Sequence, residues 1–326
     1  MTSPARRRAP SLVGRERRFG RRWRQLRSVP VLPSLITLGN LFFGFLAMAK
    51  CTDALIIQGA AAVLSVDAMR LFEVAAIFVF VAMVFDGLDG AVARLTNQAT
   101  EFGGQLDSLA DIVTFGVAPA FIAKALVDFY SRADVAVLPY HPKIYWAAAA
   151  IFVLCAAMRL ARYNVEMVDD DRDHHDFVGL PTPAAAAVLC SIVAFYASQG
   201  DAGSSISQWM LPPETYSWLI RALPVSLVLL GLLMISRFPF PHVVATVVRG
   251  RHSFPFLGTL VVVLFAAAIE WQFALLLVSV TYVVVGILLG LFRLVTRARM
   301  DGRDPEDDVG DFGDATGPRG ATFDEP

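Results

Sequence analysis

The sequence predicts an all-α protein, a polytopic membrane bundle of about eight transmembrane helices. Of the 326 residues, 56% are hydrophobic and only 17% are charged, and the mean hydropathy is +0.56. These values lie far from those of ordinary soluble domains. The apolar residues gather in long runs without the two-residue alternation of a membrane β-barrel, and lipid tolerates only helices or closed barrels. Spanning helices are therefore expected.

Each predicted span corresponds to an apolar run long enough to cross a bilayer. A hydrocarbon core of about 30 Å needs roughly 20 apolar residues in a helix, or somewhat fewer beside interfacial groups. The sequence offers eight such runs, at residues 33–50, 71–95, 107–129, 144–165, 183–199, 219–237, 255–270 and 273–294. The segment 51–70 is then expected to form a long connection between the first two helices.

The orientation of the bundle follows from its basic residues. The first 28 residues contain ten arginines and one acid. Because arginine and lysine are retained on the cytoplasmic side, we expect a cytoplasmic N-terminus, and an even number of spans returns the C-terminus to that side. Three parts are expected: a basic cytoplasmic tail at 1–28, a transmembrane domain at 29–295, and an acidic, disordered cytoplasmic tail at 296–326.

The stretch "FDGLDGAVARLTNQATEFGGQLDSLADIV", residues 85–113, places four aspartates at the cytoplasmic ends of the second and third predicted helices. At about 100° per residue, one stripe of the second helix carries Asp86, Asp89, Gly90 and Ala93, with Arg94 at its border.

On the third helix, Asp107 and Asp111 are four residues apart and share a face, and Gly103 lies one turn before Asp107. Two antiparallel helices joined by a short loop can point both pairs of acids at one another. Four carboxylates this close repel strongly, so they need cations. Oxygen ligands suit hard divalent ions. The small residues leave room for a bulky ligand, and Arg94 offers a charge for a phosphate. The pattern indicates a two-metal pyrophosphate site.

The spacing Asp86-x2-Asp89-Gly90-x2-Ala93-Arg94-x8-Gly103-x3-Asp107-x3-Asp111 resembles the signature of the CDP-alcohol phosphotransferases at every position. Further segments resemble the phosphatidylserine synthase branch of that family. They are "LPSLITLGNLFFGFLA" at 32–47, "FGVAPA" at 115–120, "MRLARYN" at 158–164, "GLPTPAAA" at 179–186 and "SRFPF" at 236–240. One departure is Ser34, where the family pattern leads us to expect asparagine.

This resemblance implies the reaction. CDP-diacylglycerol would transfer its phosphatidyl group to L-serine, with loss of CMP. By the family pattern, Mg²⁺ or Mn²⁺, as two ions, would be held by Asp86, Asp89, Asp107 and Asp111, and Asp111 would also be the general base. The CDP pocket would be shaped by Gly90, Ala93, Arg94 and Gly103.

The resemblance also implies a homodimer in the cell membrane with its active site at the cytoplasmic face. We expect no nucleic-acid partner.

Several interpretations stay open. Arg159 and Arg162 could bind the serine carboxylate or could anchor the orientation of the bundle. Thr37 and Asn40 could bond to the phosphates or could join helices. The same motif could serve another acceptor, such as glycerol phosphate or inositol phosphate, or another lipid backbone. Outside enzymes, intramembrane acids could mark the route of an ion-coupled transporter, which predicts acids near the midplane of the bilayer.

Overall fold

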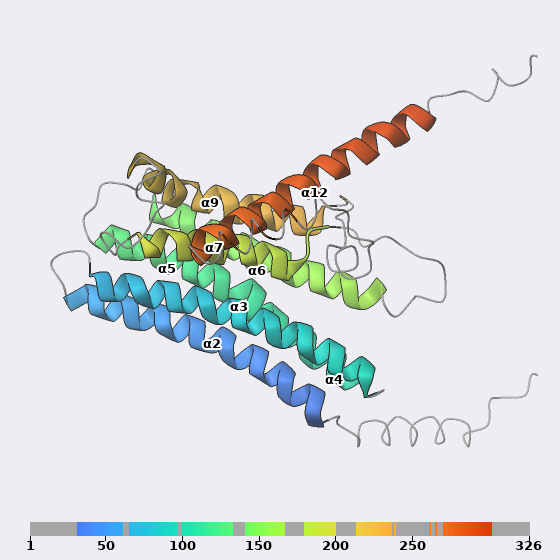
Figure 1. Ribbon diagram of the computed structural model, residues 1–326, viewed down its shortest axis with the longest axis horizontal. Coiled ribbons are helices and arrows are strands. Elements are labelled where there is room, and N and C mark those ends of the chain that lie inside the picture. The colour runs from blue at the N-terminus through green and yellow to red at the C-terminus, as the bar shows by residue number, and fades with distance from the viewer. Residues whose placement is uncertain are drawn as a thin grey trace, which may run out of the picture.

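The structure, a computed structural model, is helical throughout the part of the chain that it describes (Figure 1). The described residues are 31–60, 65–96, 100–132, 141–166, 179–199, 213–236, 238 and 270–301, together with three isolated positions between 257 and 266. The helices are α2 (Val31–Ala60), α3 (Val66–Leu95), α4 (Glu101–Asp111), the π-helical turn η1 (Ile112–Val117), α5 (Ala118–Arg132), α6 (Pro142–Glu166), α7 (Thr182–Ser198), α9 (Pro213–Ile235) and α12 (Trp271–Asp301).

Seven of the eight predicted runs coincide with helices, counting α4, η1 and α5 as one continuous element. The predicted span at 255–270 falls almost entirely outside the described residues, and the predicted tail at 1–28 lies wholly outside them. The predicted disordered tail at 296–326 begins too early, because α12 continues to Asp301, and its remainder lies outside the described residues. Within the described part, six helices are long and apolar enough to cross a membrane, and α7 is a shorter apolar helix. The chain is therefore a multi-pass helical protein, and six such helices lie within its described residues.

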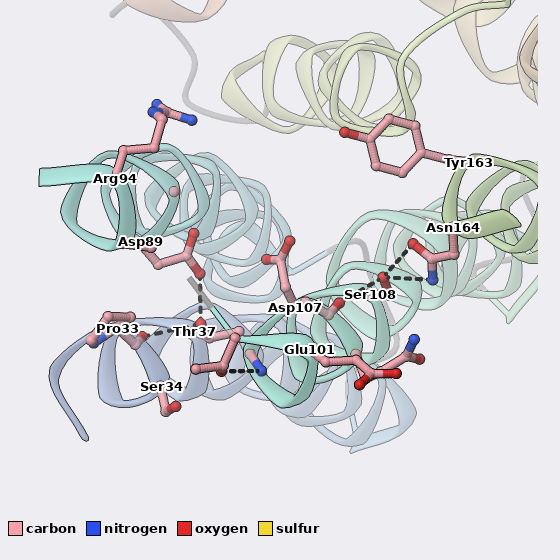
Figure 2. Close-up of a pocket in the computed structure, with 16 residues that line it drawn as sticks. Pro33, Ser34, Thr37, Asp89, Arg94, Glu101, Asp107, Ser108, Tyr163 and Asn164 are labelled. Carbon is pink, nitrogen blue, oxygen red and sulfur yellow. Dashed lines mark hydrogen bonds between the residues drawn. The ribbon is translucent and has the colours of Figure 1, made fainter. Parts of the chain in front are cut away.

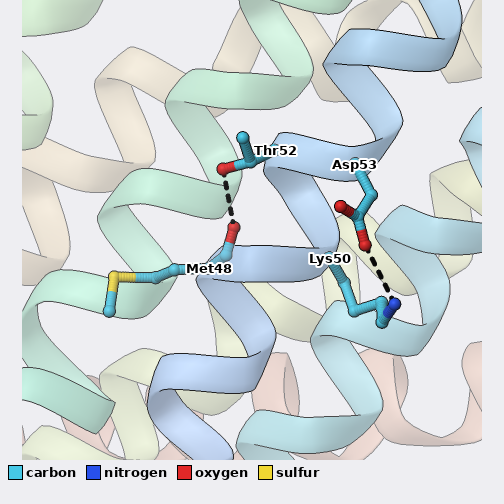
Figure 3. A network of polar contacts seen from close by, with 4 residues as sticks. All are labelled: Met48, Lys50, Thr52 and Asp53. Carbon is cyan, nitrogen blue, oxygen red and sulfur yellow. Dashed lines mark hydrogen bonds and ion pairs between the residues drawn. The ribbon is translucent and has the colours of Figure 1, made fainter.

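The first two helices are longer than their apolar runs. Instead of a connection over 51–70, α2 continues to Ala60 and α3 already begins at Val66. In the middle of α2, the ammonium group of Lys50 pairs with the carboxylate of Asp53 at 2.9 Å, and the Thr52 hydroxyl donates to the carbonyl oxygen of Met48 at 3.2 Å (Figure 3). Charged side chains end the apolar run here, but their bonds lie within the helix, so the helical backbone continues past it.

The π-helical turn η1 approaches α2 very closely. A Cβ at Gly44 of α2 would lie 2.5 Å from the hydroxyl oxygen of Thr114 and 3.0 Å from its Cα, which leaves no room for a larger residue. Thr114 belongs to the π-helical turn η1, and its hydroxyl donates to the backbone oxygen of Asn40 at 3.3 Å. A π-turn inside an α-helix is rare and is frequent at functional sites. Here it follows directly after Asp111.

The core is shared mainly by α2, α3, α5, α6, α7 and α9. Aromatic rings form a chain of edge-to-face contacts from Phe72 of α3 through Phe129 and Tyr130 of α5 to Tyr196 of α7, with centroids 5.3 to 5.5 Å apart. Most residues of α7 are buried, although the helix is short. In Figure 1, α2 and α3 run side by side along one edge, and α4 lies at the end of the bundle where α2 begins.

Candidate functional site

Three aspartates converge at this end of the bundle. Asp86 and Asp89 lie near the end of α3, and Asp107 lies in α4. Each offers a carboxylate oxygen, and the three oxygens lie within 4.8 Å of one another. The acids of the two helices thus point toward one another, as helical periodicity predicted. Three carboxylates so close repel one another unless a cation lies among them, and oxygen donors are the ligands that hard divalent ions prefer. The cluster could hold a metal ion.

The start of α4 is fixed by a cap. The side chain of Thr100 accepts a hydrogen bond from the backbone N–H of Gly103 at 3.1 Å, which satisfies one of the free donors of the first turn. A Cβ at Gly103 would lie 3.3 Å from the same hydroxyl oxygen, a tight contact. Gly103 therefore helps to shape the start of the helix as well as the space beside it.

Two residues of α2 orient the carboxylates. The Thr37 hydroxyl donates to Oδ2 of Asp89 at 2.7 Å, and the side-chain amide of Asn40 donates to Oδ1 of Asp111 at 3.1 Å. All four residues are buried. Thr37 and Asn40 thus join α2 to the helices that carry the acids. Of the two interpretations that the sequence left open, this arrangement favours the joining of helices over a bond to the phosphates.

A pocket of about 480 Å³ opens beside the acids (Figure 2). Seven of the predicted site residues line it: Thr37, Asp89, Gly90, Ala93, Arg94, Gly103 and Asp107. Arg94 is exposed and is the one basic residue among those described around this pocket. The predicted residues Asp86, Asp111, Asn40, Arg159 and Arg162 are not part of the lining. Asp111 nevertheless lies beside Asp86 and within electrostatic reach of Asp107.

One wall of the pocket consists of residues that were not among the predicted site residues. It includes Tyr163 and Asn164 of α6 and Ser108 of α4. The Asn164 amide donates to the Ser108 hydroxyl at 2.9 Å and so ties α6 to α4 (Figure 2). Tyr163 and Asn164 end the segment "MRLARYN". The sequence predicted a role for the two arginines of this segment, whereas its last two residues are the ones that line the pocket.

The two predicted arginines of α6 differ in their surroundings. Arg159 is half-buried, donates from Nη1 to the hydroxyl of Thr182 at 2.7 Å, and interacts electrostatically with Asp111. Arg162, one turn closer to the end of α6, is exposed. The structure thus brings Arg159 toward the acids and leaves Arg162 at the surface.

Several buried polar atoms at the site lack a hydrogen-bond partner within the described residues. They are Oδ1 of Asp107, Oδ1 of Asn40, Nε of Arg159 and Oγ of Ser34. A buried polar atom without a partner costs free energy, so such atoms are rare in folded proteins unless something binds them. Asp107 belongs to the acidic cluster, and its oxygen without a partner among the described residues fits a metal ligand.

Comparisons with known proteins agree with this geometry. Residues 30–220 match the family model described as CDP-alcohol phosphatidyltransferase. A protein of Helicobacter pylori (strain ATCC 700392 / 26695), named CDP-diacylglycerol–serine O-phosphatidyltransferase, is 30% identical over 217 residues, which cover 65% of this chain and 72% of that protein.

Two further relatives have the same name. The Saccharomyces cerevisiae protein is 37% identical over 159 residues, 47% of this chain and 50% of its own. The Methanocaldococcus jannaschii protein is 32% identical over 166 residues, 50% of this chain and 61% of its own. The matched region contains α2 to α7 and with them all four aspartates, and the chain belongs to the CDP-alcohol phosphatidyltransferase family.

Proposed function

We propose that the protein transfers the phosphatidyl group of CDP-diacylglycerol to the hydroxyl of L-serine, giving phosphatidylserine and CMP. The observation that carries the proposal is the convergence of Asp86, Asp89 and Asp107 beside a pocket of about 480 Å³. The names of the relatives, which come from three distant organisms, support serine as the acceptor.

In this proposal Asp86, Asp89 and Asp107, with Asp111, hold two divalent cations, Mg²⁺ or Mn²⁺. The donor set fits, because all ligands are carboxylate oxygens and Oδ1 of Asp107 has no partner among the described residues. When bound, such ions would neutralise the negative charge of the pyrophosphate. Thr37 and Asn40 orient Asp89 and Asp111 through their hydrogen bonds.

The pocket receives the CDP portion of the donor. Gly90, Ala93 and Gly103 provide space along its wall, and exposed Arg94 provides a positive charge for a phosphate. The diacylglycerol chains stay in lipid, since large apolar side chains face outward over much of the bundle. A site at the end of the helices lets the headgroup chemistry take place at the membrane surface.

The reaction needs one base. The serine hydroxyl oxygen attacks the phosphorus that carries the diacylglycerol, its proton passes to the carboxylate of Asp111, and the bond from that phosphorus to the bridging oxygen breaks to release CMP. Asn40 holds Asp111 in one orientation for this transfer. The serine carboxylate is bound by an arginine of α6, Arg159 or Arg162.

Phosphate-bearing acceptors fit the site less well. Glycerol 3-phosphate or inositol phosphate would bring two further negative charges, whereas Arg94 is the one basic side chain described at the pocket and Arg159 is the nearest on α6. A transporter is disfavoured because the acids lie at one end of α3 and α4 rather than at the middle of the helices.

The test is release of CMP by the purified protein with a panel of acceptors. We expect CMP release to depend on L-serine and to yield phosphatidylserine, with glycerol 3-phosphate and inositol phosphate as poor acceptors. Faster turnover with either phosphate acceptor would refute serine as the acceptor. Absence of any turnover of CDP-diacylglycerol would refute the transferase.

The same proposal includes the setting of the enzyme. We infer a homodimer in the cell membrane, with eight spans, both termini and the active site on the cytoplasmic side. The positive-inside distribution of arginines supports this orientation. Labelling of single cysteines introduced at residues 20 and 310 of intact cells, compared with permeabilised cells, checks the side of the membrane on which each terminus lies.

A further inference from the structure

Arg159 is held by a residue from a different helix. Its Nη1 donates to the hydroxyl of Thr182 at 2.7 Å, and Thr182 is fully buried in the first turn of α7. This bond restricts the orientation of the guanidinium group. The Nε–H, which lies on a different edge of the group, is buried and has no hydrogen-bond partner among the described residues.

Thr182 is itself held in place by the backbone before it. Gly179 has a φ of 100°, its N–H donates to the carbonyl oxygen of Phe238 at 2.9 Å, and the N–H of Leu180 donates to that of Leu233 at 3.1 Å. These bonds attach the segment in front of α7 to the end of α9 and to the residues just after it. The backbone that carries the Thr182 hydroxyl, to which Arg159 donates, is therefore held in position by hydrogen bonds to α9 and to Phe238.

The guanidinium group of Arg159 lies within electrostatic reach of the proposed site. The side chain interacts electrostatically with Asp111, the base of the proposed reaction, and with Tyr163, which lines the pocket. A planar guanidinium binds a carboxylate through paired N–H donors, and a buried donor without a partner gains most from such a bond. In serine, three bonds separate the carboxylate carbon from the hydroxyl oxygen, so one molecule can meet Arg159 and Asp111 together.

We propose that Thr182 is a positioning residue that fixes Arg159 as the receptor for the carboxylate of the acceptor alcohol. This inference rests on the proposed function and chooses Arg159 over Arg162. Arg162 is exposed, whereas Arg159 is half-buried, and the charge of Arg162 serves the orientation of the bundle. The acceptor class is a hydroxy acid with its hydroxyl close to its carboxylate.

The test compares steady-state kinetics of Thr182→Val, Thr182→Ser and Arg159→Lys with those of the full-length enzyme. Valine keeps the shape of threonine and removes the acceptor, so we expect the KM for L-serine to rise by about 10- to 100-fold, the range for a lost hydrogen bond to a charged group. The kcat and the KM for CDP-diacylglycerol should stay within about twofold, because the metal ligands and the CDP pocket are untouched.

Serine at position 182 keeps the hydroxyl, so Thr182→Ser should restore the KM for L-serine to within a few-fold of the wild-type value. Arg159→Lys keeps the charge but loses the fixed fork, and it should raise the same KM. If Thr182→Val does not fold, the Arg159→Lys and Thr182→Ser pair carries the comparison.

Any one of three results would overturn the inference. The first is an unchanged KM for L-serine in Thr182→Val and Arg159→Lys, and the second is an equal rise in the KM for CDP-diacylglycerol. The third is a KM for L-serine in Thr182→Ser as high as that in Thr182→Val. A failure of the proposed function looks different, because the wild-type enzyme itself would then release no CMP with L-serine.

Discussion

The hydroxyl of Thr37 donates a hydrogen bond of 2.7 Å to Oδ2 of Asp89, across 52 residues of sequence, and both side chains are buried. A residue of α2 thereby fixes the orientation of a carboxylate on α3. Outer partners of this kind hold metal ligands in the geometry that the ion requires.

Removal of this donor should weaken the metal site without changing its ligands. We expect Thr37→Val to raise the Mn²⁺ concentration needed for half-maximal CMP release by about 10- to 100-fold. Thr37→Ser, which retains the hydroxyl, is the matched control and should remain close to wild type. An unaltered Mn²⁺ titration in Thr37→Val would show that the bond serves packing alone.

Asp107 is predicted to be a ligand. Asp107→Asn keeps the shape but removes a charged oxygen, and turnover with Mg²⁺ or Mn²⁺ should fall by more than the roughly 100-fold that a lost outer partner costs. Glu101→Gln is the control, since Glu101 is an exposed acid at the same pocket outside the acidic cluster. A chelator should also stop the native enzyme. Wild-type activity in Asp107→Asn would remove Asp107 from the ligand set.

Asp111 is predicted to act mainly as the base. In Asp111→Asn, Asp86, Asp89 and Asp107 still hold the donor, so binding of CDP-diacylglycerol should survive while kcat falls by about 10²–10⁴-fold. Binding is measured with a fluorescent liponucleotide and kcat from CMP release. Loss of binding would make Asp111 chiefly a metal ligand, and activity within a few-fold of wild type would make it a bystander.

Gly179 is predicted to be essential for the stability of the α7 start. Its φ of 100° disfavours any side chain, and a Cβ there would lie 2.5 Å from the carbonyl oxygen of Met234. Gly179→Ala should cost at least about 1–3 kcal/mol, seen as a lower midpoint of thermal unfolding in detergent.

Gly87→Ala is the matched control for this experiment. Gly87 lies in α3, and a Cβ there would have no atom within 4 Å. Alanine should leave stability unchanged or raise it by up to about 1 kcal/mol, because glycine is a poor helix former. Equal effects of the two substitutions would contradict the conformational requirement at position 179.

The acidic cluster could be predicted because helical periodicity acts locally. Asp86 and Asp89 share a stripe, Asp107 and Asp111 share another, and a short loop brings the two helices together, so no distant contact had to be known. The end of α2 and the start of α3 were placed wrongly, because hydropathy reports where an apolar run ends and not where a helix ends. A helix with internal bonds such as that between Lys50 and Asp53 continues beyond that point.

The remaining features depend on tertiary register. Nothing local to Thr182 indicates that its hydroxyl meets Arg159, and nothing local to Asn40 indicates that its amide meets Asp111, because each pair joins helices distant in the sequence. Tyr163 and Asn164 follow the same rule. Their position at the pocket becomes apparent only when the tertiary structure brings the end of α6 to Ser108 of α4.

The π-turn between Asp111 and Ala118 separates two parts of one long helix. A π-turn holds about one residue more than an α-turn, and one residue corresponds to about 100° of rotation. The stripe that carries Asp107 and Asp111 is therefore out of phase with the stripe of α5 that packs into the core. In this way one continuous helix can turn its acids toward Asn40 of α2 and the carboxylates of α3 at one end and its apolar stripe toward the core at the other.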